Sequence, residues 1–193
     1  MFPCDKLSRY TRHIAVFSPG MRAVAESLLI ITGSMGSGKS SVLAEASDIL
    51  TLRNIPHAAI DLDALSLGHF LSHNNINQLM YANLRSIWHN FAGVGITRLL
   101  LARALETREE LDAARSAVSA KHVTVCRLTA EIATMEQRVR QRESGILQQQ
   151  FVDRVSILNA LLDRAKLEDF CIVNQDRAIH EVAMEMLQRA GWL

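Results

Sequence analysis

The stretch Gly33-Ser34-Met35-Gly36-Ser37-Gly38-Lys39-Ser40 matches the pattern G-x-x-x-x-G-K-[ST] without a mismatch. It follows Leu28–Ile31, a short continuous apolar run of the kind found in strands buried on both faces. It leads into residues 39–50, in which apolar side chains recur on one helical stripe. The glycines permit backbone conformations closed to residues with a Cβ, so that N–H groups can surround phosphate oxygens at the positive end of the helix. The sequence therefore predicts a phosphate-binding loop.

The residues of this loop also predict its nucleotide and metal. Lys39 is expected to place its charge against the β- and γ-phosphates, and the Ser40 hydroxyl is expected to coordinate Mg²⁺. Residues 173–176, Val-Asn-Gln-Asp, lack the Lys of the Asn/Thr-Lys-x-Asp element with which GTPases read guanine. We therefore expect ATP, bound by Gly33, Ser34, Met35, Gly36, Ser37, Gly38, Lys39, Ser40 and Ser41.

Strands and helices alternate along the chain from Ser27 onward. Apolar runs predict further strands at 57–62, 96–102, 123–128 and 170–173, with helical patterns between them and after the last. Two pairs have the spacing of a capping box and are expected to start helices: Thr107 with Glu110, and Thr134 with Gln137, the second at the start of a long charged helix. Five short apolar strands separated by helices predict a three-layer α/β fold with a five-stranded parallel sheet.

The first 26 residues are expected to form an N-terminal arm or extension. They contain the turn signal Ser18-Pro19-Gly20 and show no sustained apolar period, so residues 1–20 are expected to pack loosely. The chain has 193 residues, of which 49% are hydrophobic, and this is enough for one domain with a full core. The sequence thus predicts an arm, 1–26, followed by a single ATP-binding domain, 27–193.

Charge and cysteine content exclude several classes of protein. Lys and Arg total 21 against 20 Asp and Glu, and only 5% of residues are aromatic, which disfavours a nucleic-acid partner. No apolar run reaches the roughly 18 residues of a membrane-spanning helix, so no membrane partner is expected. Cys4, Cys126 and Cys171 do not have the number or spacing of a disulfide scaffold or a metal site, which favours the reducing cytoplasm.

Two carboxylates follow the second predicted strand. Asp61 and Asp63 stand at its carboxyl end, the edge at which ligands bind in open α/β sheets. If the strand continues to Asp63, both side chains point to the same side. One carboxylate could hold Mg²⁺ and the other could accept the proton of an attacking hydroxyl, and we assign Asp61 to the metal and Asp63 to the acceptor. The alternative for Asp63 is that it caps the next helix.

The phosphate-binding loop followed by Asp61-Leu62-Asp63 resembles the small-molecule kinases of the P-loop superfamily, such as adenylylsulfate, gluconate and shikimate kinases. The stretches 58–65, 98–103 and 125–130 are similar to a group of ATP-binding proteins described as adenylylsulfate-kinase-like. The resemblance covers the chain after the arm and implies a kinase-like domain with the three-layer P-loop NTPase fold of nucleoside and nucleotide kinases. It also implies ATP and Mg²⁺ as cofactors and a small-molecule acceptor. One departure is Ala64-Leu65-Ser66-Leu67, which stands where adenylylsulfate kinases have an Asn and an Arg for their substrate.

Kinases of this type close an arginine-bearing lid over the triphosphate. Here Arg138 and Arg142 stand four residues apart on one expected helix face, and Gly145 offers a hinge. The resemblance implies that both arginines act on the phosphates as catalytic residues. The alternative is a solvated helix in which Glu136 and Arg140 form an ordinary exposed pair.

The remaining site residues are placed by the same resemblance. The acceptor is expected to bind between the second and third strands and at the end of the third, at Asn83, Trp88, Asn90 and Arg103. Core packing is the alternative for Trp88. Asn174 and Asp176 follow the fifth strand, where this architecture contacts adenine.

The sequence favours an enzyme that transfers the γ-phosphoryl group of ATP to a small-molecule acceptor in a Mg²⁺-dependent reaction. The expected catalytic residues are Lys39, Asp61, Asp63, Arg138 and Arg142, and the expected metal ligands are Ser40 and Asp61. Two alternatives stay open: a nucleotide-binding regulator or partner-dependent ATPase, and a kinase that acts on nucleic-acid ends. An enclosed second pocket beside Asp61 and Asp63 would favour the small-molecule kinase, a broad apolar surface patch the regulator, and a basic groove leading to the loop the end kinase.

Overall fold

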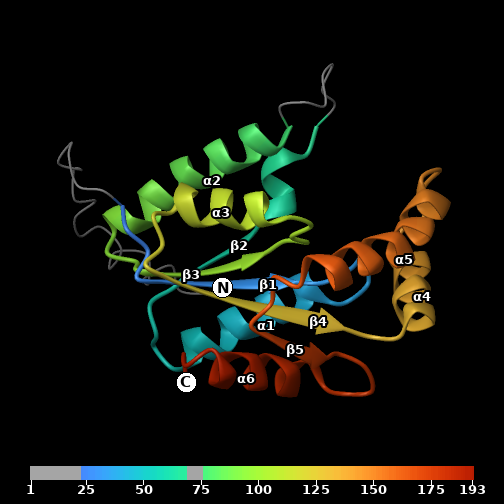
Figure 1. The fold of residues 1–193 in the computed structure, drawn as a ribbon. Helices are drawn as coiled ribbons and strands as arrows, with labels where there is room; N and C mark the ends of the chain where they lie inside the picture. Colours follow the sequence, from blue (N-terminus) through green and yellow to red (C-terminus); the bar gives the residue numbers. More distant parts are fainter. Residues whose placement is uncertain (1–22, 69–75) are drawn as a thin grey trace, which may run out of the picture.

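A computed structural model describes residues 23–68 and 76–193 of the chain (Figure 1). The strands are β1 (Ser27–Thr32), β2 (Ala58–Asp61), β3 (Arg98–Ala102), β4 (His122–Thr129) and β5 (Phe170–Val173). The helices are α1 (Lys39–Leu52), α2 (Ile76–Gly93), α3 (Arg108–Ala117), α4 (Ile132–Arg142), α5 (Gln148–Ala165) and α6 (Ile179–Arg189), with a short 3-10 helix η2 (Leu62–Ser66) after β2. Each of the five predicted strands is therefore present.

The strands form one parallel sheet in the order β2-β3-β1-β4-β5. The central strand β1 pairs with β3 on one side and β4 on the other, and its residues Leu28–Ile31 are fully buried. Helices α2 and α3 pack on one face of the sheet, while α1 and α6 pack on the other (Figure 1). This is the predicted three-layer α/β fold of a P-loop NTPase, in which the central strand has no solvent-facing side.

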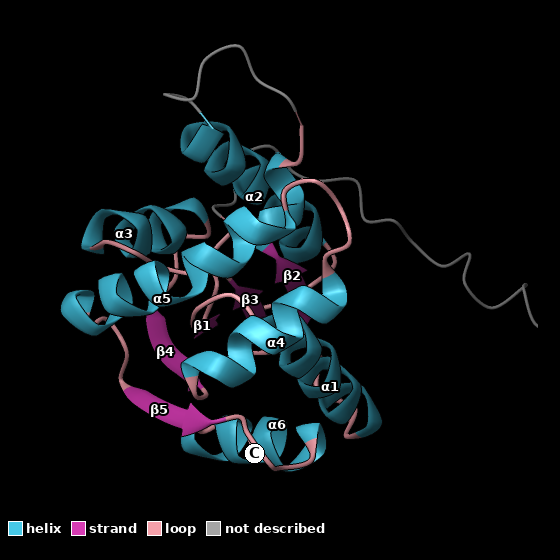
Figure 2. Cartoon of the chain, turned by 90° about the vertical axis from the view of Figure 1, so that its right-hand side faces the viewer, coloured by secondary structure: helices cyan, strands magenta, loops and turns pink. Residues whose placement is uncertain are grey.

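Helices α4 and α5 form a hairpin in front of the sheet when the molecule is seen as in Figure 2. The hairpin has a small core of its own, against which Met35 packs, consisting of Met135, Val139, Val152 and Val155. The expectation of one long charged helix from Thr134 is wrong. Thr134 lies inside α4, whose N-cap is Glu131 without a side-chain cap bond, and the chain leaves the helix at Glu143 before α5 begins.

Two predictions about helix starts have different outcomes. Thr107 caps α3 by accepting a hydrogen bond from the Glu110 N–H at 3.3 Å, as the capping spacing predicts. Strand β2, however, ends at Asp61, whose carboxylate accepts a hydrogen bond from the Asp63 N–H at 3.2 Å and starts η2. The N-cap is therefore Asp61 and not Asp63, and the two side chains do not share one face of an extended strand.

The described part of the predicted arm begins at Ala23. Ala25 is fully buried and its N–H donates to the Val118 carbonyl at 3.0 Å, while the Ala23 carbonyl accepts from the Trp88 indole at 3.0 Å. These contacts join the last residues of the predicted arm to the domain. The expectation of loose packing concerns residues 1–20, which lie outside the described residues.

Of the helices that the structure describes, none combines the length and the hydropathy needed to cross a bilayer.

Candidate active site

The loop between β1 and α1 turns through three glycines with positive φ. Gly33, Gly36 and Gly38 have φ values of 145°, 75° and 92°. A Cβ on Gly36 would lie 2.3 Å from the Met135 carbonyl oxygen, and a Cβ on Gly38 would lie 2.2 Å from the side-chain nitrogen of Asn174. Both the backbone conformation and the available space therefore require glycine. The loop can fold tightly beneath α4 and the segment after β5 only because these side chains are absent.

The Lys39 ammonium lies against the same loop. Its Nζ donates to the carbonyl oxygens of Gly33 and Ser34, each at 3.1 Å. Desolvation by burial lowers the pKa of Lys39 to about 8, although the neighbouring charges of Asp63 and Asp61 oppose the shift. The Lys39 charge is thus held by two carbonyl oxygens that incoming phosphate oxygens could replace.

Two serines of the loop hold it to the rest of the fold. The Ser34 hydroxyl is buried and donates to the Val155 carbonyl of α5 at 2.8 Å. The Ser37 carbonyl accepts a hydrogen bond from the Asn174 side chain at 2.8 Å, and Ser37 itself is fully buried. The loop is therefore fixed on both sides, by α5 and by the segment after β5. Such fixing keeps its N–H groups in one arrangement before a ligand binds.

The end of the loop meets the end of β2. The Ser40 hydroxyl donates to Oδ2 of Asp61 at 2.6 Å. Mg²⁺ suits such a pair, because it commonly takes one or two protein oxygens and completes its shell with water and substrate phosphates. Ser40 and Asp61 could therefore hold the ion beside Lys39. Among the residues that the structure describes, no group of three or more His, Cys, Asp and Glu side chains forms another candidate metal site.

The second carboxylate, Asp63, makes an ion pair with Arg103 at the end of the neighbouring strand. Arg103 also faces Glu110, with 3.8 Å between the charged atoms. Burial disfavours the charged form of Arg103, but Asp63 and, to a lesser extent, Glu110 and Tyr81 together outweigh this effect and raise the pKa of the guanidinium above its ordinary value. Its Nε is buried and has no hydrogen-bond partner within the described residues. Arg103 therefore orients Asp63 from the side, while half of the Asp63 side chain stays exposed.

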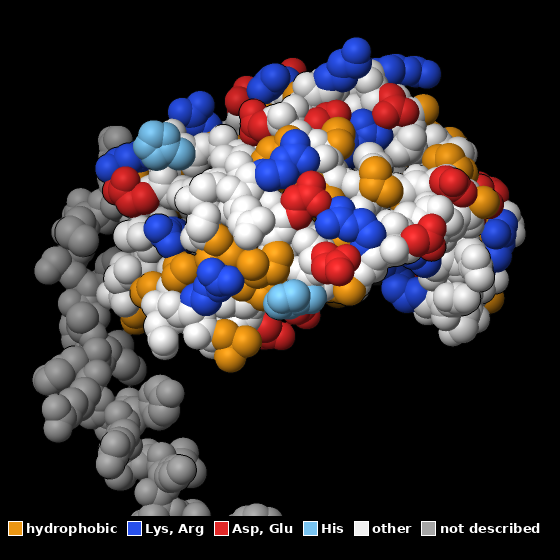
Figure 3. Space-filling view, turned by 90° about the horizontal axis from the view of Figure 1, so that it is seen from below, with side chains coloured by type: hydrophobic (Ala, Val, Ile, Leu, Met, Phe, Trp, Pro, Cys, Tyr) orange, Lys and Arg blue, Asp and Glu red, His pale blue; other side chains and the backbone are white. Residues whose placement is uncertain are grey.

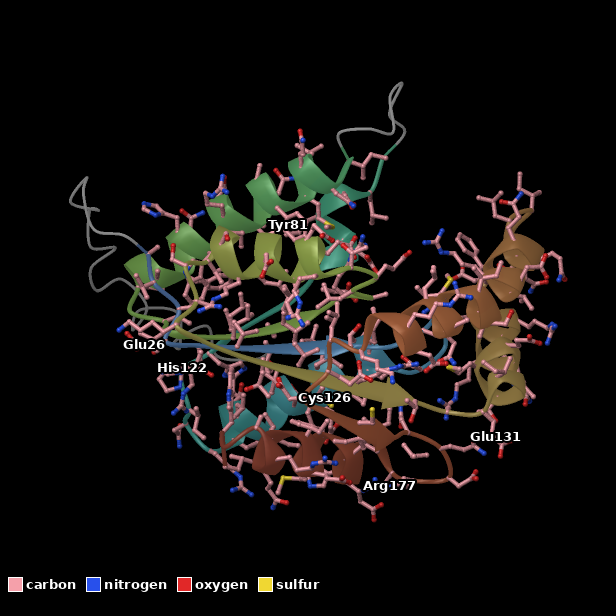
Figure 4. All side chains as sticks on the ribbon, viewed as in Figure 1. Glu26, Tyr81, His122, Cys126, Glu131 and Arg177 are labelled. Carbon is pink, nitrogen blue, oxygen red and sulfur yellow. The ribbon has the colours of Figure 1, made fainter. Side chains whose placement is uncertain are left out.

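A cleft of about 580 Å³ opens beside this ion pair. It lies between α2, the start of α3 and α5, and it is lined by Asn77, Gln78, Tyr81, Arg103, Glu106, Thr107, Glu109, Glu110, Ala113 and Arg154. Tyr81 lies between α2 and α3 (Figure 4), and its hydroxyl donates to the Glu110 carbonyl at 3.0 Å. Burial, assisted by the charge of Glu110, raises the pKa of Tyr81 to about 12, so the phenol stays protonated at neutral pH.

The two arginines expected in the lid have different surroundings. Arg138 of α4 donates to the Gly36 carbonyl at 3.3 Å and to the Asn174 carbonyl at 3.0 Å. It therefore bridges the loop and the segment after β5. Arg142, at the end of the same helix, is exposed and pairs with Glu143 at 2.9 Å. Its positive charge makes a minor contribution to the lowered pKa of Lys39, behind the desolvation by burial.

The residues expected near adenine lie at the ends of β4 and β5. Asn174 is buried, and its side chain binds the loop through Ser37, which leaves its backbone as the part facing Arg138. Asp176 is exposed, with φ of 55°. It lines a shallow hollow of about 360 Å³ together with Thr129, Ala130, Glu131, Val173 and Gln175.

Two of the predicted acceptor residues lie at the far end of the sheet from the loop. In Figure 4, Glu26 and His122 mark the end where strands begin, and Glu131 marks the end where β4 leads into α4. Trp88 belongs to the first end, because its indole binds the chain ahead of β1 and its side chain is only 1% exposed. Asn90 follows it on α2 and is exposed. Trp88 therefore packs in the core, which was the alternative interpretation of this residue. The structure does not support an acceptor role for Trp88 or Asn90.

The other two predicted acceptor residues lie nearer the loop. The Asn83 side chain donates to the Leu65 carbonyl at 2.8 Å and so fastens η2 to α2. It does not line the cleft, whereas Arg103 does. Of the four predicted acceptor residues, Arg103 is therefore the one that the structure brings to the cleft.

Several residues of the cleft were not predicted from the sequence. The sequence predicts Glu110 only as a capping residue. In the structure its carboxylate accepts hydrogen bonds from the Glu106 N–H at 2.7 Å and from the Asn77 side chain at 3.4 Å. Arg154 of α5 pairs with Glu106 at 2.9 Å across the opening. Their place in the chain could have indicated these residues, because a helix that follows a parallel strand begins at the carboxyl edge of the sheet, where ligands bind.

Comparisons with known proteins identify the fold. No protein-family model matches the sequence, and a search of curated proteins also gives no match. Among solved structures, an APS kinase of Mycobacterium tuberculosis in complex with AMPPNP and APS is 21% identical, with a TM-score of 0.58 over 85% of this chain and 96% of that chain. A gluconokinase of Sinorhizobium meliloti is 15% identical, with a TM-score of 0.59 over 86% and 93%. Shikimate kinase of Acinetobacter baumannii in complex with shikimate is 15% identical, with a TM-score of 0.56 over 86% and 92%.

These similarities show that the chain has the fold of the P-loop small-molecule kinases. The fold that the resemblance implies is therefore confirmed. Activity and acceptor are separate questions, because one fold can carry many chemistries and function follows from the site.

Proposed function

We propose that this protein transfers the γ-phosphoryl group of ATP to a hydroxyl group of a small-molecule acceptor, with Mg²⁺. The observation that carries the proposal is the 2.6 Å hydrogen bond from Ser40 to Asp61 beside Lys39. It joins a phosphate-binding loop and a metal-binding carboxylate at one edge of the sheet. The cleft beside Asp63 opens on the same edge and is separate from the loop, as an acceptor site must be.

The residues divide the reaction between them. The loop and Lys39 hold the triphosphate, and Ser40 and Asp61 hold Mg²⁺, which neutralises phosphate charge when it is bound. Asp63, kept in place by Arg103, accepts the proton of the acceptor hydroxyl. The hydroxyl oxygen forms the new bond to the γ-phosphorus, the bond from the γ-phosphorus to the bridging β–γ oxygen breaks, and ADP leaves with that oxygen. Arg142 supplies positive charge to the γ-phosphoryl group as it moves.

The nucleotide base has a proposed place as well. Arg138 joins the Gly36 and Asn174 carbonyls, so its guanidinium lies between the loop and the segment after β5. Adenine would lie against this guanidinium and contact the backbone near Asn174 and Asp176. The α4–α5 hairpin, which carries Arg138 and Arg142, would act as the lid.

The two alternatives have less support from the described residues. A kinase of nucleic-acid ends needs a basic path to the loop, but the cleft beside Asp63 carries three glutamates and two arginines. The face seen in Figure 3 also mixes Lys and Arg with Asp and Glu. A regulator without an acceptor does not need this second cleft.

Cys126 and Cys171 are free thiols, which agrees with the cytoplasmic location that we also propose.

The test is acceptor-dependent ADP formation. The full chain is incubated with Mg-ATP and a library of hydroxyl-bearing metabolites, and ADP release is followed with and without each compound. We expect at least one compound to raise ADP release well above the slow hydrolysis in water, and Lys39→Ala to abolish the increase. If every compound leaves the rate at that of hydrolysis, the kinase function is contradicted.

A further inference from the structure

The cleft beside Asp63 differs in electrical character from the loop beside it. On the loop side, Lys39, Arg138 and Arg142 bring positive charge to the place of the triphosphate. On the cleft side, the lining contains Glu106, Glu109 and Glu110 against Arg103 and Arg154. With Asp63 at the boundary, carboxylates outnumber guanidinium groups by four to two. The sign of the local charge therefore reverses between the two halves of the candidate active site.

Neither arginine of the cleft is without a carboxylate partner. Arg103 pairs with Asp63 and faces Glu110 at 3.8 Å, and Arg154 pairs with Glu106 at 2.9 Å. An anionic ligand that bound either guanidinium would lie close to the carboxylate already paired with it, and the two negative charges would repel each other. The two guanidinium groups are thus positioned to orient carboxylates of the protein itself.

Glu109 adds a carboxylate that no guanidinium neutralises within the described residues. It lies in the first turn of α3 and is exposed. A hydrogen bond from its own backbone and, to a lesser extent, one with the Thr107 side chain lower its pKa. Glu109 therefore remains ionised at neutral pH. Together with the Glu110 carboxylate and the Asn77 amide, it offers hydrogen-bond acceptors to a ligand in the cleft.

From these observations we infer that the acceptor is a polyhydroxylated compound that is uncharged or carries an ammonium group, and that has no carboxylate or phosphate of its own. Hydroxyl and ammonium groups donate hydrogen bonds, and the cleft presents mainly carboxylate oxygens to receive them. A volume of about 580 Å³ lies within the range of small-molecule sites. The inference rests on the proposed kinase function and narrows its substrate class. The same negative charge keeps ATP itself out of the acceptor cleft.

The experiment determines the charge class of the acceptor directly. A protein-free metabolite extract is separated by ion exchange into cationic, neutral and anionic fractions, and each is incubated with the full chain, Mg²⁺ and ATP labelled in the γ-phosphate. We expect labelled phosphate esters from the cationic or the neutral fraction, and no more label in the anionic fraction than with Lys39→Ala. Labelled esters formed mainly from the anionic fraction would overturn the inference while leaving the kinase function intact. No transfer in any fraction would contradict the kinase function, and the inference with it.

A matched pair of variants tests the role of the cleft. Glu109→Lys reverses an exposed charge in the cleft, and Asp48→Lys makes the same change at an exposed position of α1, on the other face of the sheet. With the fraction that yields the labelled ester, we expect kcat/KM to fall at least about tenfold for Glu109→Lys and to stay unchanged for Asp48→Lys. An equal effect of both variants, or none of either, would overturn the assignment of the ligand class to this cleft.

Discussion

The Ser40 hydroxyl donates a 2.6 Å hydrogen bond to Asp61, and this bond connects the end of the phosphate-binding loop to the end of β2. The same carboxylate accepts the Asp63 N–H, which turns the chain into η2 and sends Asp63 toward Arg103. One aspartate thus fixes the position of the second. Metal binding and acceptor activation, as proposed, are coupled through the geometry of a three-residue segment.

The first prediction concerns the metal. Ser40→Ala removes the hydroxyl that we assign to Mg²⁺, so the Mg²⁺ concentration needed for half-maximal ADP release should rise at least about tenfold. Binding of ATP in the absence of Mg²⁺ should change little, because Lys39 and the loop remain. A Mg²⁺ titration of activity measures the effect, with Ser86→Ala on the exposed side of α2 as the control. Identical titration curves for Ser40→Ala and the wild type would exclude the assignment.

The second prediction concerns the shape of the loop. Gly36→Ala places a Cβ 2.3 Å from the Met135 carbonyl and also forces alanine to φ of 75°. Gly191→Ala imposes a similar φ, 69°, where a Cβ meets nothing within 4 Å. Gly191→Ala should therefore cost about 1–2 kcal/mol through backbone strain alone, while Gly36→Ala should cost more and abolish the ATP-induced rise in Tm. Thermal unfolding with and without ATP compares them, and equal behaviour of the two variants would contradict the close packing of the loop under α4.

The third prediction concerns pH. Burial lowers the pKa of Lys39 to about 8 in the protein without nucleotide. Lys39 loses its proton as pH rises through this value, and the triphosphate favours the protonated form. Affinity for ATP should therefore be constant below pH 7 and should fall about tenfold between pH 7 and pH 9, since each pH unit above the pKa removes a factor of ten of the charged form. Calorimetric titration across this range measures it, and a constant Kd up to pH 10 would show that the Lys39 charge does not hold the phosphates.

The fourth prediction tests the placement of Trp88. Trp88→Phe removes the indole N–H that binds the Ala23 carbonyl and leaves a partly buried acceptor without its partner. Stability should fall by about 1–3 kcal/mol, while KM for ATP and for the acceptor should not change. Denaturant unfolding and steady-state kinetics separate the two effects. A higher KM for the acceptor without loss of stability would restore the substrate role predicted from the sequence.

The parts of the site that could be predicted from the sequence are those built by neighbouring residues. The loop from Gly33 to Ser40 needs only its own glycines and the flanking strand and helix, and the apolar runs reveal the parallel sheet. The start of α4 depends instead on distant contacts. The Glu131 N–H bonds with the Gln175 side chain at 2.9 Å, and α4 therefore begins ahead of the capping signal at Thr134.

The acceptor side could be predicted only in part, for a similar reason. Helical spacing places Trp88 on a stripe of α2 but does not say which end of the sheet that part of the helix meets. The structure shows that α2 runs back toward the strand starts, so residues near its beginning, such as Tyr81, lie by the cleft. Arg154 reaches the cleft from α5, far along the chain. Contacts of this kind arise from the packing of whole elements and leave no local pattern.

The most direct test of the account is Asp61→Asn, measured for nucleotide binding and for turnover in the same preparation. Turnover with the acceptor, or the slow hydrolysis of ATP, should fall at least about 100-fold, because metal and nucleophile lose their positions. The Kd for ATP should change far less, since the loop and Lys39 hold the phosphates. Asp48→Asn, the same change on the exposed side of α1, should behave as the wild type. Wild-type turnover in Asp61→Asn would contradict the catalytic site described above.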